Sequence, residues 1–196
     1  MASTSLHSPQ RRKVQMRQAT IEDLELLLKW DEEDYLQDEE KFGDAEYNEW
    51  NWEKELSRPM VDWRDILIAE YEGRPIGVVQ VIDPSREESC YWGNDGKNTD
   101  YIAEFCKPNY RAIDIWIGEP DCLGKGLGTL MMQQTLQDYC FADPDVTAVL
   151  VDPMATHPDA IRFYQEKCGF EPIGLRQFGP DECLVHKLDR SKWEGT

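Results

Sequence analysis

A glycine-rich turn between an apolar run and a segment of helical periodicity is the strongest constraint on the fold of this 196-residue chain. Residues 113–117 have the composition of a buried strand, and the turn that follows reads Leu-Gly-Lys-Gly-Leu-Gly-Thr over residues 123–129. A helix that starts at such a turn leaves its first N–H groups without acceptors and points the positive end of its dipole at the turn. Glycines let the backbone curve closely around a phosphate, and Lys125 adds a cation. The turn therefore predicts a phosphate site, although a plain strand-to-helix connection has the same composition.

Two familiar phosphate-binding patterns do not fit this turn. A P-loop requires Gly-x-x-x-x-Gly-Lys-Ser/Thr, whereas the lysine here lies between two glycines. A dinucleotide-binding fold carries its glycines near the start of a strand–helix series, whereas this turn lies past the midpoint of the chain, after segments that look antiparallel. A different phosphate-binding fold is therefore indicated.

A second strand-to-helix motif follows further along the chain. Residues 148–151, Ala-Val-Leu-Val, predict a buried strand that ends at Asp152. Residues 159–167 predict a helix that Gly169 closes, with His157 just before it and Tyr164 inside it. Two ordered motifs narrow the choice of fold much further than the first motif alone.

Together the two motifs resemble those of the GNAT superfamily of acyl-CoA-dependent N-acetyltransferases. The pyrophosphate loop of that superfamily, Arg/Gln-x-x-Gly-x-Gly/Ala, is similar to residues 123–128, with Leu123 in place of the polar first residue. Its second motif, Asn-x-x-Ala-x-x-x-Tyr…Gly-Phe, is similar to residues 157–170, with His157 in place of Asn. The resemblance implies an α/β GNAT fold, with a mixed, largely antiparallel sheet that is splayed at the acetyl-CoA site and flanked by helices.

Within the superfamily, residues 111–170 are most similar to aminoglycoside 6′-N-acetyltransferases and their relatives. The likeness upstream is loose, and residues 83–110 match little. The resemblance implies acetyl-CoA as cosubstrate and a primary amine of a polycationic small molecule as acceptor, with a link to antibiotic resistance. Two alternatives remain: an N-acyltransferase of siderophore assembly that acts on a hydroxylysine-like amine, and a CoA-binding relative without turnover.

The same resemblance assigns candidate site residues. Asp114 would orient or deprotonate the amine, and Tyr164 would protonate the departing thiolate. Trp116 and Asp152 would join Asp114 in contacting the acceptor, and no metal is expected. The residues expected at the cofactor are Gly118, Leu123, Gly124, Lys125, Gly126, Leu127, Gly128, Thr129, His157, Ala160 and Tyr164.

Each assignment has a structural alternative. Period two along the strand places Asp114 and Trp116 on the face opposite the isoleucines, where the first could be a hydrogen-bonding structural carboxylate and the second a packing residue. Asp152 could cap a turn, and Tyr164 could belong to the core. His157 fits a loop or helix cap better than a catalyst.

The charge of the chain bears on its partners. The net charge is −18, and twelve acidic residues lie between Asp31 and Glu55, interleaved with Trp and Tyr. Such a segment is either a solvated acidic face or, on the acceptor side, a surface suited to a polycationic amine. The acidic excess disfavours nucleic acid as a ligand.

Composition indicates one domain over residues 13–190, preceded by a disordered tail at residues 1–12. Six widely spaced cysteines, without Cys-x-x-Cys pairs, indicate reduced thiols in a cytoplasmic protein and neither disulfides nor zinc. The sequence contains no run of eighteen apolar residues, so it predicts no membrane span. We expect a monomer or a homodimer.

Turn and capping signals predict the remaining elements. A helix should start at Thr20, with Asp23 completing a capping box, and a shorter one should lie around residues 50–58. A first strand is expected at residues 14–18, with hairpins formed by residues 65–71 with 75–82 and by residues 173–178 with 183–188.

Overall fold

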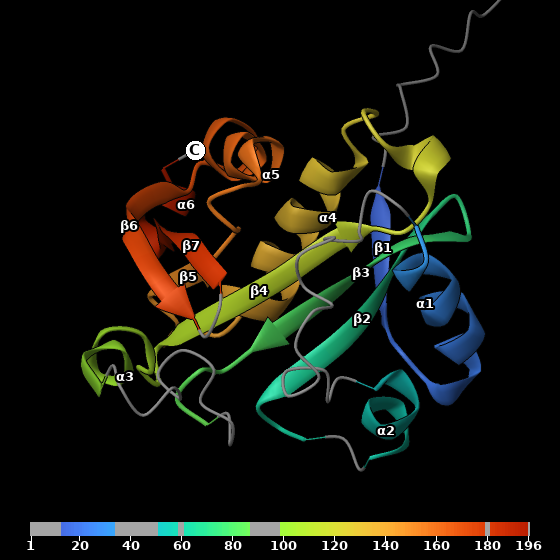
Figure 1. The fold of residues 1–196 in the computed structure, drawn as a ribbon, viewed down its shortest axis with the longest axis horizontal. Helices are drawn as coiled ribbons and strands as arrows, with labels where there is room; N and C mark the ends of the chain where they lie inside the picture. The colour runs from blue at the N-terminus through green and yellow to red at the C-terminus, as the bar shows by residue number, and fades with distance from the viewer. Residues whose placement is uncertain (1–12, 34–50, 59–60, 87–98, 179–180, 196) are drawn as a thin grey trace, which may run out of the picture.

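The structure, a computed structural model, describes residues 13–33, 51–58, 61–86, 99–178 and 181–195. Its centre is a seven-stranded sheet of order β1-β2-β3-β4-β5-β7-β6 (Figure 1). Neighbouring strands are antiparallel except β4 and β5, which are parallel. The strands are β1 (Val14–Gln18), β2 (Arg64–Tyr71), β3 (Arg74–Ile82), β4 (Tyr110–Ile117), β5 (Ala148–Val151), β6 (Glu171–Phe178) and β7 (Asp181–Asp189).

The described helices are short. They are α1 (Leu24–Asp31), α2 (Trp52–Ser57), α3 (Thr99–Phe105), α4 (Leu127–Thr135), α5 (Pro158–Arg162) and α6 (Arg190–Trp193). Two 3₁₀ turns, η1 (Ile21–Asp23) and η2 (Pro120–Cys122), and two π-helical turns, η3 (Leu136–Cys140) and η4 (Phe163–Lys167), complete the order. None of the helices in the described segments has the length and apolarity needed to cross a lipid bilayer.

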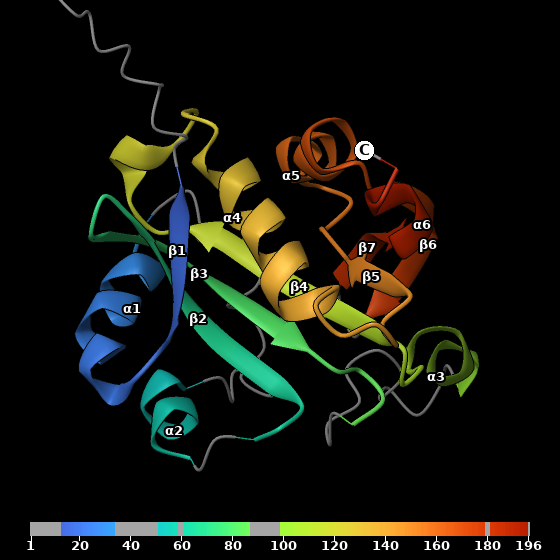
Figure 2. The ribbon, with the colours of Figure 1, turned by 180° about the vertical axis from the view of Figure 1, so that it is seen from behind.

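Different helices cover the two faces of the sheet. On one face, Leu27 and Trp30 of α1 and Trp52 of α2 pack against Ile68 and Val78. On the other face, α4 contributes Leu127, Met131 and Met132 to a larger core that includes Leu67 and Val79. Figure 2, the view from behind, shows α4 lying across this second face. Burial on both sides explains why β2 and β3 have nearly continuous apolar sequences.

The structure confirms the predicted mixed, largely antiparallel sheet and its first strand and hairpins. It also confirms the capping box, in which the backbone N–H of Thr20 donates to Asp23 Oδ2 at 2.8 Å. The helix then begins with a 3₁₀ turn before α1. In the shorter predicted helix, α2, the Asn51 side chain accepts from the N–H of Lys54 at 2.9 Å, so the helix starts at Trp52.

Three features differ from the sequence-based expectation. The region that matched little, residues 83–110, contains α3, whose Phe105 is fully buried with Phe178 in a satellite core. The helix expected over residues 159–167 is α5 followed by the π turn η4, and α6 extends past residue 190. The predicted tail at residues 1–12 and most of the acidic segment, residues 34–50, lie outside the described residues.

Candidate active site

The centre of the site is the point where β4 and β5 separate. The parallel pairing of these strands covers only Tyr110 to Ala112 on β4 and stops before Asp114. On its other edge β4 stays paired with β3 as far as Ile117. The rest of β4 therefore diverges from β5, and this opening is the splay expected from the sequence.

The glycine-rich turn leads into α4 at this opening. Gly124 and Gly126 have φ of +70° and +77°, and a Cβ added at either would have no atom within 4 Å. Gly126 is the N-cap of α4, so the N–H groups of its first turn, including those of Gly128 and Thr129, point out of the helix end. Lys125 and Leu123 are exposed beside them. An open, left-handed backbone next to free N–H groups and a cation fits a pyrophosphate.

Tyr164 lies in η4, opposite α4. Its side chain is buried, and its ring packs on Phe163 and Phe170 at centroid distances of 5.2 and 6.0 Å. Burial raises the pKa of Tyr164 well above its usual value, and the negative charges of Asp114 and Asp152 add to this rise. The hydroxyl therefore keeps its proton through the neutral range.

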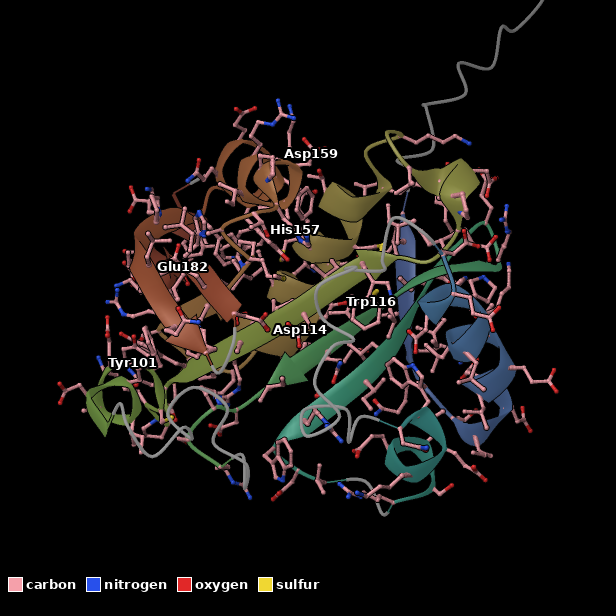
Figure 3. The ribbon with its side chains drawn as sticks, in the orientation of Figure 1. Tyr101, Asp114, Trp116, His157, Asp159 and Glu182 are labelled. Carbon is pink, nitrogen blue, oxygen red and sulfur yellow. The ribbon has the colours of Figure 1, made fainter. Side chains whose placement is uncertain are left out.

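Two carboxylates act electrostatically on the Tyr164 hydroxyl. Asp114 is exposed on β4, and Asp152 follows the end of β5 and is half-buried. Asp114, Asp152 and Tyr164, the three polar residues that the motifs suggested, thus lie in one part of the fold, where their charges interact. Figure 3 shows Asp114 near the middle of β4, with His157 lying toward α5.

Trp116 lies on the face of the sheet that α1 and α2 partly cover. It lies two residues after Asp114 on the same face of β4 (Figure 3). Its ring is 6.2 Å from that of Trp52 on α2. The indole N–H of Trp52 donates to Asp31 Oδ2 at 2.6 Å. Burial raises the pKa of Asp31, although this hydrogen bond opposes the rise. Helices α1 and α2 thus hold an aromatic pair beside Asp114.

Gly118 has a packing role that the sequence did not reveal. A Cβ at this position would lie 2.0 Å from Trp30 Cδ2, so only glycine lets the Trp30 ring pack here. The Trp30 indole N–H and Lys29 Nζ donate to Glu119 Oε1 at 2.9 and 3.0 Å. Burial alone would raise the pKa of Glu119, but these two bonds and one from Arg74 together outweigh it and hold the pKa below its usual value. Helix α1 is thereby fixed to the end of β4.

The other predicted cofactor residues occupy α4, α5 and their N-terminal ends. Leu127 is buried at the start of α4, and Gly128 faces the Phe163 ring, where a Cβ would lie 3.5 Å away. His157 is the exposed N-cap residue of α5, and Ala160 packs against the main core. The helix-cap alternative for His157 is therefore correct in position, although its side chain does not form the cap hydrogen bond.

Sequence reasoning missed a buried histidine beneath Tyr164. His186 on β7 is fully buried, with its ring 6.4 Å from that of Tyr164. Its Nδ1 lies 2.7 Å from the Leu184 carbonyl, which can only accept, so Nδ1 carries the proton and Nε2 accepts from Gln165 at 3.0 Å. A histidine alternating with valine and leucine in an apolar strand is the signal that could have revealed it.

The sequence analysis also did not single out Gln80, which lies in the apolar strand β3 opposite Asp114. Gln80 is 6% exposed. The only sequence signal was a polar residue inside the run Ile-Gly-Val-Val-Gln-Val-Ile.

The family assignment follows from this geometry and from comparison. Residues 20–178 match the family described as "Acetyltransferase (GNAT) domain". The chain belongs to this GNAT acetyltransferase family. The splayed strands, the glycine turn before α4 and the tyrosine helix are the parts that the sequence motifs had indicated.

Two curated relatives match part of the chain. Aminoglycoside N(6′)-acetyltransferase type 1 of Klebsiella pneumoniae is 36% identical over 107 residues, which are 55% of this chain and 47% of that protein. A kanamycin resistance protein of Rhizobium radiobacter is 43% identical over 67 residues, which are 34% of this chain and 60% of that protein. The chain thus spans about half the length of the curated relatives it matches.

A solved structure is similar over nearly the whole chain. The aminoglycoside acetyltransferase AAC(6′)-Ib, in complex with coenzyme A and kanamycin, has a TM-score of 0.70 and 27% sequence identity. The match covers 94% of this chain and 99% of that one.

Proposed function

We propose that this protein is an acetyl-CoA-dependent N-acetyltransferase that transfers acetyl to a primary amine of a polycationic small molecule of the aminoglycoside type. The observation that carries the proposal is the separation of β4 from β5 just before Asp114, where the charges of Asp114 and Asp152 both act on the buried Tyr164 hydroxyl. The AAC(6′)-Ib structure with coenzyme A and kanamycin, which matches this chain over 94% of its length, supports the same assignment.

The proposed cofactor site is the glycine turn with the first turn of α4. The N–H groups of Leu127, Gly128 and Thr129 would bind the pyrophosphate, and Lys125 would add charge. The side chains of His157 and Ala160 would border the cofactor from α5. The cosubstrate supplies a thioester carbonyl that an amine can attack.

The residues of the chain would manage the protons of this reaction. Asp114 would accept a proton from the ammonium, or hold the amine in position, so that its lone pair can attack. Tyr164 would give a proton to the sulfur that leaves. A buried hydroxyl that remains protonated is suited to this role. Direct attack within a ternary complex needs no covalent intermediate on the enzyme.

The proposed acceptor site combines charge with aromatic surface. Asp114 and Asp152 would each bind an ammonium group, and Trp116 with Trp52 would form an apolar wall against a sugar ring or alkyl chain. The acidic residues of the segment between Asp31 and Glu55 would add attraction at longer range.

An acceptor screen tests the proposal directly. Release of CoA thiol would be measured with kanamycin, with linear polyamines, with a hydroxylysine-like amine and with neutral amines. The proposal expects the largest kcat/KM for the aminoglycoside. Binding of acetyl-CoA without thiol release for any amine would favour the non-catalytic alternative, and preference for the hydroxylysine-like amine would favour the siderophore alternative.

The proposed function also implies a role in the cell, namely resistance to an aminoglycoside. Acetylation in the cytoplasm, where acetyl-CoA is made, would protect cells from an aminoglycoside. Expression in a susceptible bacterium should then raise the inhibitory concentration of kanamycin, whereas the Asp114→Asn variant should not. Sedimentation analysis would decide between a monomer and a homodimer.

A further inference from the structure

The side chain of Gln80 lies on the acceptor face, in one row with Asp114. Across the sheet, Ile66 on β2 is the register partner of Gln80, and Gln80 is the partner of Asp114 on β4. Directly opposed residues of antiparallel strands project to the same side, with Cβ atoms about 4.5–5.5 Å apart. The neighbouring row is Ile68, Val78 and Trp116, so both rows belong to the face that α1 and α2 partly cover.

The surroundings of Gln80 within the strands are apolar apart from Asp114. Val78 and Ile82 flank it along β3, and Ile66 lies on its other side. Gln80 is only 6% exposed. An apolar residue would therefore suit this position in the fold. Packing alone does not explain why the residue is a glutamine.

The Gln80 amide is buried, and it forms no hydrogen bond with any side chain or backbone group in the described parts of the chain. Buried polar side chains are nearly always hydrogen-bonded, and leaving one unsatisfied costs about 1–3 kcal/mol. Other buried polar residues are satisfied: Thr135 donates to the Met131 carbonyl at 2.9 Å, and Asp23 accepts from Arg17 at 2.7 Å. Among these buried polar residues, Gln80 thus stands apart as one whose amide is unsatisfied, and it lies beside Asp114.

We propose that Gln80 is a specificity-determining residue that binds the acceptor. Its amide hydrogen-bonds a hydroxyl of the acceptor, a few bonds from the amine that Asp114 holds. This inference rests on the proposed function and adds the substrate class: amines that carry a polar group close to the reacting nitrogen.

In this proposal, Asp114 and Gln80 bind different groups of the acceptor. Asp114 is anionic and selects the ammonium, whereas the amide is neutral and both donates and accepts, which matches a hydroxyl group. The separation of adjacent strands fits two groups on one small ring better than two ends of a long chain. A site built to hydrogen-bond a substrate hydroxyl discriminates strongly against the analogue that lacks it.

The test compares the Gln80→Met variant with the wild type on two matched amines. Kanamycin B carries hydroxyls on the amino sugar next to its aminomethyl group, and dibekacin is its 3′,4′-dideoxy analogue. We expect Gln80→Met to lower kcat/KM for kanamycin B about 10- to 100-fold and to change kcat/KM for dibekacin less than about threefold, since the lost bond is made by one amine only.

A stability measurement accompanies the kinetics. Met has nearly the same length and no unsatisfied amide, so the Tm of Gln80→Met in the absence of ligand should equal or exceed that of the wild type. Thr135→Val is the control, because Thr135 is buried in α4 with its hydroxyl bonded, away from the acceptor face. It should lower Tm and leave the ratio of the two kcat/KM values unchanged.

The outcomes separate the two proposals. Equal losses of kcat/KM for both amines, or no loss for either, would overturn the role of Gln80 while leaving the acetyltransferase assignment in place. A marked loss of Tm in Gln80→Met, with equal effects on both amines, would make Gln80 structural. If the wild type neither binds nor acetylates either amine, the proposed function and this inference both fail.

Discussion

The two sides of β4 are built in different ways. Around α4 and η4, the proposed cofactor contacts come from backbone N–H groups and glycines within two continuous segments. On the other side, the proposed acceptor contacts come from side chains on β3, β4 and α2 and from Asp152 after β5, which are far apart in the sequence. A backbone site leaves a recognisable motif, because glycine is needed at fixed positions, whereas a side-chain site can be assembled from many residue types.

Replacing Asp114 by Asn should give the largest change and would establish that the acceptor side carries the chemistry. The variant keeps the shape of the side chain but removes the charge, so we expect kcat/KM for the amine to fall about 10²- to 10⁴-fold. Calorimetry should show unchanged acetyl-CoA affinity. The exposed Asp138→Asn, on η3, is the matched control, and near-normal activity of Asp114→Asn would remove Asp114 from the mechanism.

Tyr164→Phe should slow the proposed protonation of the departing sulfur, which takes place between the cofactor side and the acceptor side. We expect kcat to fall about 10- to 10³-fold with little change in acetyl-CoA affinity, as for loss of a general acid. Because burial raises the pKa of Tyr164, its ionisation should not lower wild-type kcat between pH 7 and about 10. A fully active variant would return Tyr164 to the core.

Gly126 tests whether the backbone forms the cofactor site. Gly126 and Gly73 have φ of +77° and +78°, and neither has an atom within 4 Å of an added Cβ. Alanine at either position should cost about 1–2 kcal/mol of stability through backbone strain. Only Gly126→Ala should also weaken acetyl-CoA binding, by about 10-fold, and a bulky residue at Gly128, beside Phe163, should act similarly. Equal acetyl-CoA affinity in the Gly126 and Gly73 variants would contradict the assigned turn.

Ionic strength distinguishes the two sides without mutation. Exposed attraction between carboxylates and a polycation is screened over about 8 Å at physiological salt. Raising salt from low to moderate concentration should therefore increase KM for the amine several-fold, much more than KM for acetyl-CoA. Efficient, salt-independent acetylation of a monocationic amine would instead indicate a different class of acceptor.

The smallest expected effect is on stability at acid pH, and it comes from the buried His186. Burial lowers the pKa of His186, although its hydrogen bond to Leu184 opposes this. The unfolded chain then binds a proton more readily, so the stabilising contribution is complete above pH ~6.5 and is lost as the pH falls below that value. His186→Phe should reduce the loss of Tm between pH 7 and 5.5 by on the order of 2 °C. His157→Gln, at an exposed position, should not, and identical acid curves for all three proteins would contradict a neutral buried His186.

Much of the fold could be predicted from sequence because its signals are local. The capping box at Thr20, the hairpins and the two glycine motifs each depend on residues a few positions apart. The contacts between Trp30 and Gly118 and between Gln165 and His186 join segments that only the tertiary structure brings together. The π turn at Tyr164 was not predictable either, because nothing in its sequence distinguishes it from an α-helix.

The position of β7 in the sheet has a consequence for synthesis. β7 lies between β5 and β6, although it follows both in the chain, and it carries His186 beneath Tyr164. The sheet from β1 to β4 can form as the ribosome delivers it, because each strand pairs with the one before. The half that holds β5 and the tyrosine helix must wait for β7. During synthesis, the part of the sheet next to Asp152 and Tyr164 therefore assembles after the part from β1 to β4, once residues 181–189 have been made.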